Sequence, residues 1–385
     1  MPLYPLAEWI VWNWWSLLYE PDAHWLREQR CYSRRHNLLY VGDGISMPDI
    51  EFRPLGRHVQ VIWAPSSHPY QQIDFMGCGT AIVERDQFLA SFYSLVEGVC
   101  SRLEQESVPG TALVEGWEGV KESMGDNEES LFCQAVATQG KDPYSLEPSE
   151  EDNVLMVARM IPETLHRDFF HIGSWESLYQ QAETLLKALH WIEHNKGNWK
   201  NLSLLREKIT VPAKGIVPWE QGYILARILR TALGCNGKMF SSLSDIVQLF
   251  KVSEYQLAQT MKSQETMTGL DAVVGENESG SPGFIIRPRC RPENQMFSFC
   301  RALCEYFVSP HLPNLVVDAN TERQKRNRAF AAEFLAPAEV IRSRLTGRET
   351  SREEIDEIAY LMGTSSYIIA HQVENHSLAV IMDDP

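Results

Sequence analysis

Apolar and polar positions in the first part of the chain follow two different periods. Residues 1–20 are rich in tryptophan and leucine and predict a helix that ends near Pro21. Beyond them, β-branched and aromatic runs between Gly, Pro and Ser clusters predict strands at 37–41, 59–63 and 80–83. Residues 86–104 return to helical spacing. Together these elements predict a small α+β domain over residues 1–120.

The rest of the chain is predicted to be largely helical. Residues 121–152 are acidic and polar, which favours a linker or a surface excursion, and residues 153–274 are expected to form a helical middle domain. The run GENESGSPG at 275–283 favours a domain boundary, and a strand at 284–287 opens a last domain over residues 284–385. Helices are expected at 174–194, 218–234, 295–308, 320–335, 351–363 and 365–375, and one or two more over residues 240–262. The predicted fold is α+β, multidomain and helix-rich.

Composition narrows the class of protein. The 385 residues carry a net charge of −16, which makes a nucleic-acid partner unlikely on electrostatic grounds. The eight cysteines form no C-x-x-C pair, which is typical of reduced, buried thiols. The apolar opening is interrupted by Glu8, Asn13 and Glu20 and lacks a basic segment before it. We therefore expect a cytoplasmic protein without membrane attachment, and a helix packed on its own domain rather than a tryptophan-rich membrane-interface face.

Two later segments belong together by their order and separation. The first is NQMFSFCRALCEYF at 294–307, and the second is RNRAFAAEFLAPAEVIRSRL at 326–345, which contains the phrase FAAEFLAP. With the terminal stretch GTSSYIIAHQVENHSL at 363–378, they make residues 284–378 similar to the ImmA/IrrE family of bacterial metallopeptidase-like proteins. The resemblance implies a zincin-like C-terminal domain.

The sequence departs from that family at its metal ligands. In the family, two histidines four residues apart on one helix bind zinc, and the glutamate after the first activates water. The aligned positions are Arg301, Ala302 and Glu305, and the third-ligand region falls at Gln324–Arg326, with Glu322 the closest acid. An arginine stays protonated and an alanine is no base, so neither a catalytic metal nor another cofactor is expected. Arg301 and Glu305, four residues apart, are expected to form an ion pair in place of the metal.

Two further patterns have alternative interpretations. His190, Glu193 and His194 in HWIEH fit the inverted H-x-x-E-H pattern of another zinc-peptidase class, but histidines also suit the negative end of a helix dipole. The basic run RQKRNR at 323–328 is either an interaction surface or a solvated helix face. Its candidate interaction residues are Arg323, Lys325 and Arg328.

These patterns favour a non-catalytic regulatory or scaffold protein that binds another protein through a degenerate peptidase domain. The resemblance implies a setting in bacterial phage defence, stress or toxin–antitoxin regulation. The alternative is a metallopeptidase whose metal site is non-standard, using His190, His194 or Glu305, or is completed by a partner. A nucleic-acid sensor that uses the basic run is a third hypothesis.

Overall fold

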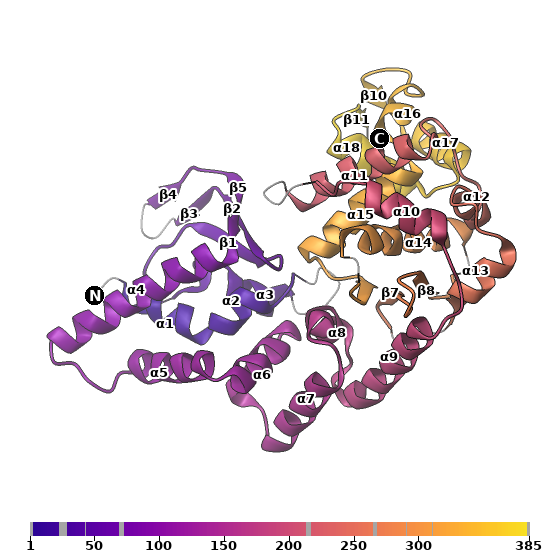
Figure 1. Cartoon of the computed structure of the whole chain (residues 1–385). Coiled ribbons are helices and arrows are strands. Elements are labelled where there is room, and N and C mark those ends of the chain that lie inside the picture. The colour runs from indigo at the N-terminus through magenta and orange to yellow at the C-terminus, as the bar shows by residue number, and fades with distance from the viewer. Residues whose placement is uncertain are drawn as a thin grey trace. The chain divides into compact units, whose positions relative to one another are not determined.

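The computed structural model describes the chain except residues 1–2, 23–28, 43, 69–72, 213–216, 265–267, 290, 310 and 383–385 (Figure 1). The fold is α+β and helix-rich, as predicted. The chain forms two compact units. The first, called the N unit, comprises Met1–Tyr179 with Ala319–Glu322, and the second, the C unit, comprises Gln180–Asp318 with Arg323–Pro385.

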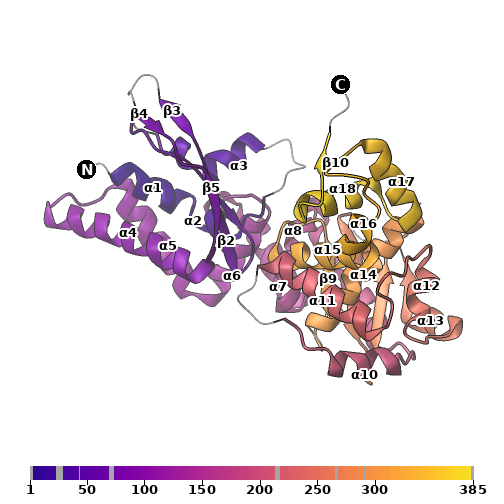
Figure 2. The same cartoon turned by 90° about the horizontal axis from the view of Figure 1, so that it is seen from above.

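The N unit opens with two short helices, α1 (Tyr4–Trp12) and α2 (Trp14–Tyr19), in place of the single helix predicted over residues 1–20. Trp9, Trp14 and Trp15 are buried, and the Trp14 ring packs edge-on against Trp117 with 5.0 Å between ring centroids. Most of the tryptophan-rich face therefore belongs to the core. The later helices α4 (Arg85–Gln105) and α5 (Ala112–Gly125) lie beside α1 (Figures 1 and 2).

An antiparallel sheet with strand order β1-β2-β5 packs against α2 and α4. Its strands are β1 (Asp49–Pro54), β2 (His58–Ala64) and β5 (Gly79–Glu84), and β3 (Ser66–His68) pairs with β4 (Ile73–Phe75). The strands predicted at 59–63 and 80–83 are confirmed. The strand predicted at 37–41 is wrong, because α3 (Gln29–His36) ends there and a single 3-10 turn, η1 (Leu38–Tyr40), follows. The Asn37 side chain accepts a hydrogen bond from Leu39 N and caps this turn.

The acidic stretch 121–152 is not an irregular linker. It contains the end of α5, all of α6 (Asn127–Thr138), the turn η2 (Pro143–Ser145) and the start of α7 (Pro148–Met160). Its acids cap helices: Asp126 accepts hydrogen bonds from the backbone N–H groups of Glu128 and Glu129, each at 2.9 Å. Helix starts thus account for much of the acidity that suggested a linker. The N unit is completed by η3 (Glu163–Leu165), α8 (His166–Ile172) and η4 (Trp175–Ser177).

The C unit is built on a four-stranded sheet of order β6-β8-β7-β9. Its strands are β6 (Met261–Ser263), β7 (Leu270–Glu276), β8 (Pro282–Ile286) and β9 (Asn314–Val317), with only the β6–β8 pair parallel. Residues 275–283, expected to be a domain boundary, form the end of β7, the turn and the start of β8. Turn-rich composition marks a hairpin as well as it marks a linker, so the boundary was placed wrongly.

The helices before this sheet share its core. They are α9 (Leu178–Glu193), α10 (Lys200–Lys208), α11 (Pro218–Ala232), α12 (Leu243–Gln248) and α13 (Glu254–Thr260). Leu229 and Phe250 from the expected middle domain lie in one apolar cluster with Phe299 and Phe330 from the expected last domain. Residues 180–274 and 284–385 therefore do not form separate domains.

Helix α14 (Pro292–Val308) packs on β7, β8 and β9, and it is buried over most of its circumference. Helix α15 (Glu322–Leu335) lies beside it in both views (Figures 1 and 2). The chain ends with α16 (Ala338–Arg342), β10 (Glu349–Thr350), α17 (Arg352–Met362), α18 (Ser366–Asn375) and β11 (Val380–Ile381). The helix predicted over 351–363 corresponds to α17, which Ser351 caps and Gly363, with a φ of 62°, ends. In the described part of the chain, no helix has the length and apolarity needed to cross a membrane.

Candidate functional site

The residues aligned with a metal site meet at the α14–α15 interface. Arg301 and Glu305 on α14 and Gln324 on α15 are buried there, together with Asn327 one turn further along α15. Ala302 is also buried, but it packs in the apolar core. The structure thus places most of the predicted positions in one buried polar network.

Arg301 is the centre of this network. Its Nε donates to Asn327 Oδ1 at 2.8 Å, and its Nη1 donates to Asp271 Oδ2 on β7 at 3.0 Å. Its Nη2 donates to the Val317 carbonyl of β9 at 2.6 Å and to Gln324 Oε1 at 2.8 Å. The planar guanidinium therefore joins one helix to two strands and to the neighbouring helix.

Glu305 binds the other half of the network. Its carboxylate accepts from Asn327 Nδ2 at 3.1 Å and from Arg326 Nη2 at 3.2 and 3.3 Å, and Arg323 Nε lies 3.6 Å away. Asn327 therefore bridges Arg301 and Glu305, which were expected to pair directly. Each of the two charges has an ionic partner from another element, Asp271 for Arg301 and the α15 arginines for Glu305.

Gln324 joins α15 to β9, the edge strand of the C-unit sheet. Its Oε1 accepts from Val317 N at 3.1 Å, and its Nε2 donates to the Leu315 carbonyl at 2.9 Å. A glutamine can donate and accept at the same time, which a carboxylate metal ligand cannot do. At this position the side chain therefore completes hydrogen bonds of β9.

The basic run of α15 is not a solvated face. Arg323, Lys325, Arg326 and Arg328 are all partly buried. Arg323 and Arg326 face Glu305, and Arg328 Nη2 donates to the Asp318 carbonyl at 2.6 Å. Burial, and then the charge of Arg301, lowers the pKa of Arg328 to about 10. The run neutralises a buried acid because α15 packs with this side against α14.

The residues at this interface do not fit a zinc ion. A guanidinium has only donors and cannot ligate a metal, and the oxygens of Glu305 already bind Asn327 and Arg326. The neighbouring Cys304 thiol is buried, and burial raises its pKa, which opposes the thiolate form that zinc requires. Arg323 and Arg326 would also repel a cation. The donor set is that of a structural polar network.

Glu322, the acid closest in sequence to the expected ligand position, has a different role. It belongs to the N unit, where its Oε2 lies 2.8 Å from His58 Nδ1 on β2 and its backbone N donates to the Leu55 carbonyl at 2.7 Å. His58 Nε2 lies 3.1 Å from Glu84 on β5. Within the N unit, the carboxylate therefore joins the segment Ala319–Glu322 to the sheet.

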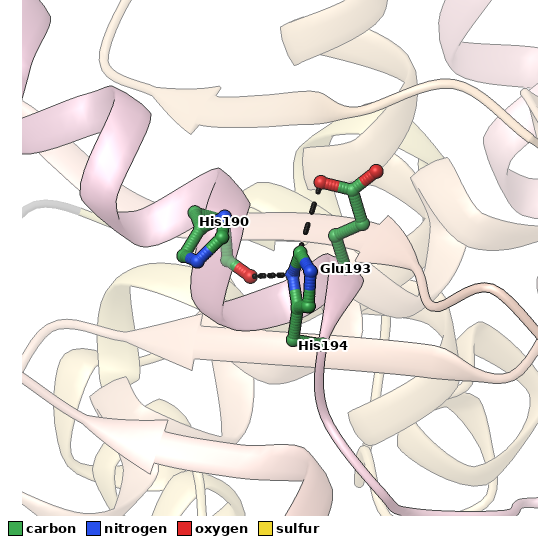
Figure 3. Close-up of side chains that lie close together, drawn as sticks. All are labelled: His190, Glu193 and His194. Carbon is green, nitrogen blue, oxygen red and sulfur yellow. Dashed lines mark hydrogen bonds and ion pairs between the residues drawn. The ribbon is translucent and has the colours of Figure 1, made fainter.

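The second candidate set lies at the surface, at the end of α9. Figure 3 shows His194 between the backbone carbonyl of His190 and the carboxylate of Glu193. All three residues are exposed, and each offers one ligand atom within 4.8 Å of the others. Among the described residues, they are the one group of three or more histidine, cysteine or acidic side chains with this spacing. Glu305 is not part of it.

Sequence reasoning missed Asp271 and Asn327, which pair with Arg301. Asp271 stands inside the apolar run LDAVV, and a lone acid in a buried strand signals a partner charge. No protein-family model matches the chain, and a search of curated proteins finds no match either. The interpretation of the site therefore depends on its own geometry.

Proposed function

We propose that the chain is a non-catalytic regulatory or scaffold protein, and that its C unit is an ImmA/IrrE-like domain that binds another protein. The observation that supports this is the Arg301 network. In a working zinc peptidase, a metal ion would join the two ligand-bearing helices. Here the guanidinium of Arg301, bridged to Glu305 by Asn327, joins α14 to α15 without a metal.

In this proposal, the network keeps the domain rigid while the binding surface lies elsewhere. Tyr360 on α17 and Tyr367 on α18 are 86% and 71% exposed, and Leu361 beside Tyr360 is also exposed. Tyrosines bury much area at low entropy cost and are enriched among the residues that dominate binding energy. We assign the partner contact to these exposed side chains of α17 and α18, and the setting to regulation in bacterial defence or stress.

The test is recovery of a partner with the full-length tagged chain from its native host, followed by mass spectrometry. The expected result is one abundant partner that stays intact. The double variant Tyr360→Ser/Tyr367→Ser should lose this partner, whereas Tyr255→Ser should keep it. Tyr255 on α13 is a matched control, because it is 74% exposed in the same unit.

The competing hypothesis is a peptidase with a partner-completed or non-standard metal site. It predicts that a co-expressed protein is cleaved, that chelation stops the cleavage, and that an intact partner does not accumulate. That set of results would overturn the binding proposal. Partner recovery that is equal for the double variant and for the Tyr255 control would reject the assigned surface.

A further inference from the structure

The end of α9 carries side chains that the proposed function does not use. His190 and His194 are four residues apart, so they lie on the same face of the helix, and their ring centroids are 4.1 Å apart. Glu193 lies beside them, and it and His194 are 62% and 52% exposed. Two imidazoles and a carboxylate are therefore accessible to an ion from solvent (Figure 3).

The hydrogen bond of His194 selects the nitrogen that can bind a metal. Its Nδ1 lies 3.0 Å from the backbone carbonyl of His190, and a carbonyl oxygen only accepts. The Nδ1 atom must therefore carry the proton, which leaves a lone pair on Nε2. Histidines that bind metals in proteins have the same arrangement, with the other ring N–H donated to a carbonyl or carboxylate.

A second element brings a carboxylate to that nitrogen, whereas Glu193 contacts His194 at the other ring nitrogen, with its Oε2 3.9 Å from Nδ1. Glu278, in the turn between β7 and β8, has its Oε1 4.0 Å from His194 Nε2. Its backbone N donates to the Glu193 carbonyl at 3.3 Å. Asn277 holds the turn in place, because its Nδ2 donates to the carbonyls of Asn195 at 3.0 Å and Gly197 at 3.1 Å. The position of Glu278 beside α9 is therefore set by its own backbone N–H and by the side chain of Asn277, both of which donate to backbone carbonyls at and after the end of α9.

We propose that His190, His194, Glu193 and Glu278 bind a divalent transition-metal ion, with Zn²⁺ as the best match. Imidazole and carboxylate donors in a group of four suit tetrahedral zinc, whereas calcium and magnesium prefer oxygen donors alone. With zinc–ligand bonds of about 2.0–2.1 Å, tetrahedral donors lie about 3.4 Å apart. His194 Nε2 and Glu278 Oε1 therefore need to approach by about 0.6 Å. The Glu278 side chain must also turn toward the other donors, since it lies outside the group whose ligand atoms are all within 4.8 Å of one another.

The surroundings favour a cation. Both histidines lie in the last turn of α9 or directly after it, where the helix dipole carries partial negative charge. The two carboxylates compensate the charge of a divalent ion. The ion would fasten the end of α9 to the β7–β8 turn, so it would stabilise the C unit without taking part in catalysis. This inference stands independently of the proposed function.

The test is Zn²⁺ titration of the metal-stripped full-length protein by calorimetry, with Co²⁺ absorption as a report of tetrahedral geometry. One site per chain is expected, with a rise in the melting temperature. His190→Ala and His194→Ala should each weaken binding by at least about tenfold, and Glu278→Gln should weaken it measurably. His371→Ala is the control, because His371 on α18 is also exposed and lies 3.6 Å from Glu374.

Absence of Zn²⁺ binding by the wild type would overturn the site. Zn²⁺ affinity in His190→Ala and His194→Ala that equals the affinity of the wild type would overturn it as well. Unchanged affinity in Glu278→Gln would overturn the link between α9 and the hairpin. Metal that persists in the double variant His190→Ala/His194→Ala and supports peptide cleavage would instead argue against the proposed function. The two failures are therefore distinguishable.

Discussion

Arg301 shows how a single residue can take over the role of a cross-link between elements. Its donors reach Asp271, Asn327, Gln324 and the Val317 carbonyl, and the whole group is buried. Asp271 also pairs with Arg289, so its charge keeps one ionic partner when Arg301 is removed. The buried acceptors on Asn327, Gln324 and Val317, however, would each lose a donor, and an unsatisfied buried polar group is costly.

Replacing Arg301 with methionine should lower the free energy of unfolding by about 2–4 kcal/mol, because Asn327, Gln324 and the Val317 carbonyl would lose a buried donor, while Asp271 keeps Arg289 as its ionic partner. Urea unfolding followed by circular dichroism measures this change. Arg102→Met is the control, since Arg102 pairs with Glu106 on the surface and contributes about 0–1 kcal/mol. A loss at Arg301 no greater than that of the control would show that the network does not stabilise the fold.

At the scale of elements, Glu333 joins α15 to three other helices. Its carboxylate accepts from Arg227 Nε on α11 at 2.8 Å, from Gln372 Nε2 on α18 at 2.8 Å, and from Ala338 N at the start of α16 at 3.3 Å. Burial opposes its ionisation, but hydrogen bonds from His376, Arg227 and Gln372 outweigh burial and lower its pKa. The charged form of this acid therefore stabilises the packing of the last helices.

The lowered pKa of Glu333 makes the stability of the folded state depend on pH. A carboxyl whose pKa is lower in the folded state stabilises it above its ordinary pKa, and that stability is lost as pH falls through the lowered value. Glu333→Gln should cost about 1–3 kcal/mol at neutral pH, and the difference from wild type should shrink on acidification. Chemical unfolding at a series of pH values measures it.

Glu339→Gln, an exposed position on α16, should show no such trend. A Glu333→Gln penalty that stays constant from neutral to acidic pH would mean that the interaction does not depend on the charge. A constant penalty in both variants would point to a loss of packing or helix propensity instead.

At the scale of the whole molecule, the chain is divided into two units that are not continuous in sequence. The short segment Ala319–Glu322 belongs to the N unit, although the residues on either side of it belong to the C unit. Each unit has its own buried residues, from Trp14 and Trp117 in the first to Phe299 and Phe330 in the second. Separate cores favour separate cooperative unfolding.

Calorimetry should therefore resolve two thermal transitions. Arg301→Met should lower the transition of the C unit by on the order of 10 °C and leave the other within experimental error. A single transition, or an equal shift of both, would mean that the two units unfold together. His58→Ala, which removes the partner of Glu322 in the N unit, should shift the other transition.

Local signals in the sequence were sufficient to predict the boundaries of some helices. Ser351 and Gly363 define α17 because a cap and a left-handed glycine act within one turn, and Pro218 begins α11 for a similar reason. The residue types at Arg301 and Ala302 were likewise enough to expect that no zinc binds there. The same local signals misled at residues 121–152, where acids that cap helices resembled those of a linker.

Pairing between distant elements was decided only by the tertiary structure. The short run NLVV of β9 is a strand because β7 supplies its hydrogen-bond partners, and four residues alone do not mark it as one. Asp271 contacts Arg301 across 30 positions, and Glu278 in the β7–β8 turn lies 4.0 Å from His194 at the end of α9. Residue type determines what each side chain can donate or accept, whereas the packing of the sheet and helices determines which partner it finds.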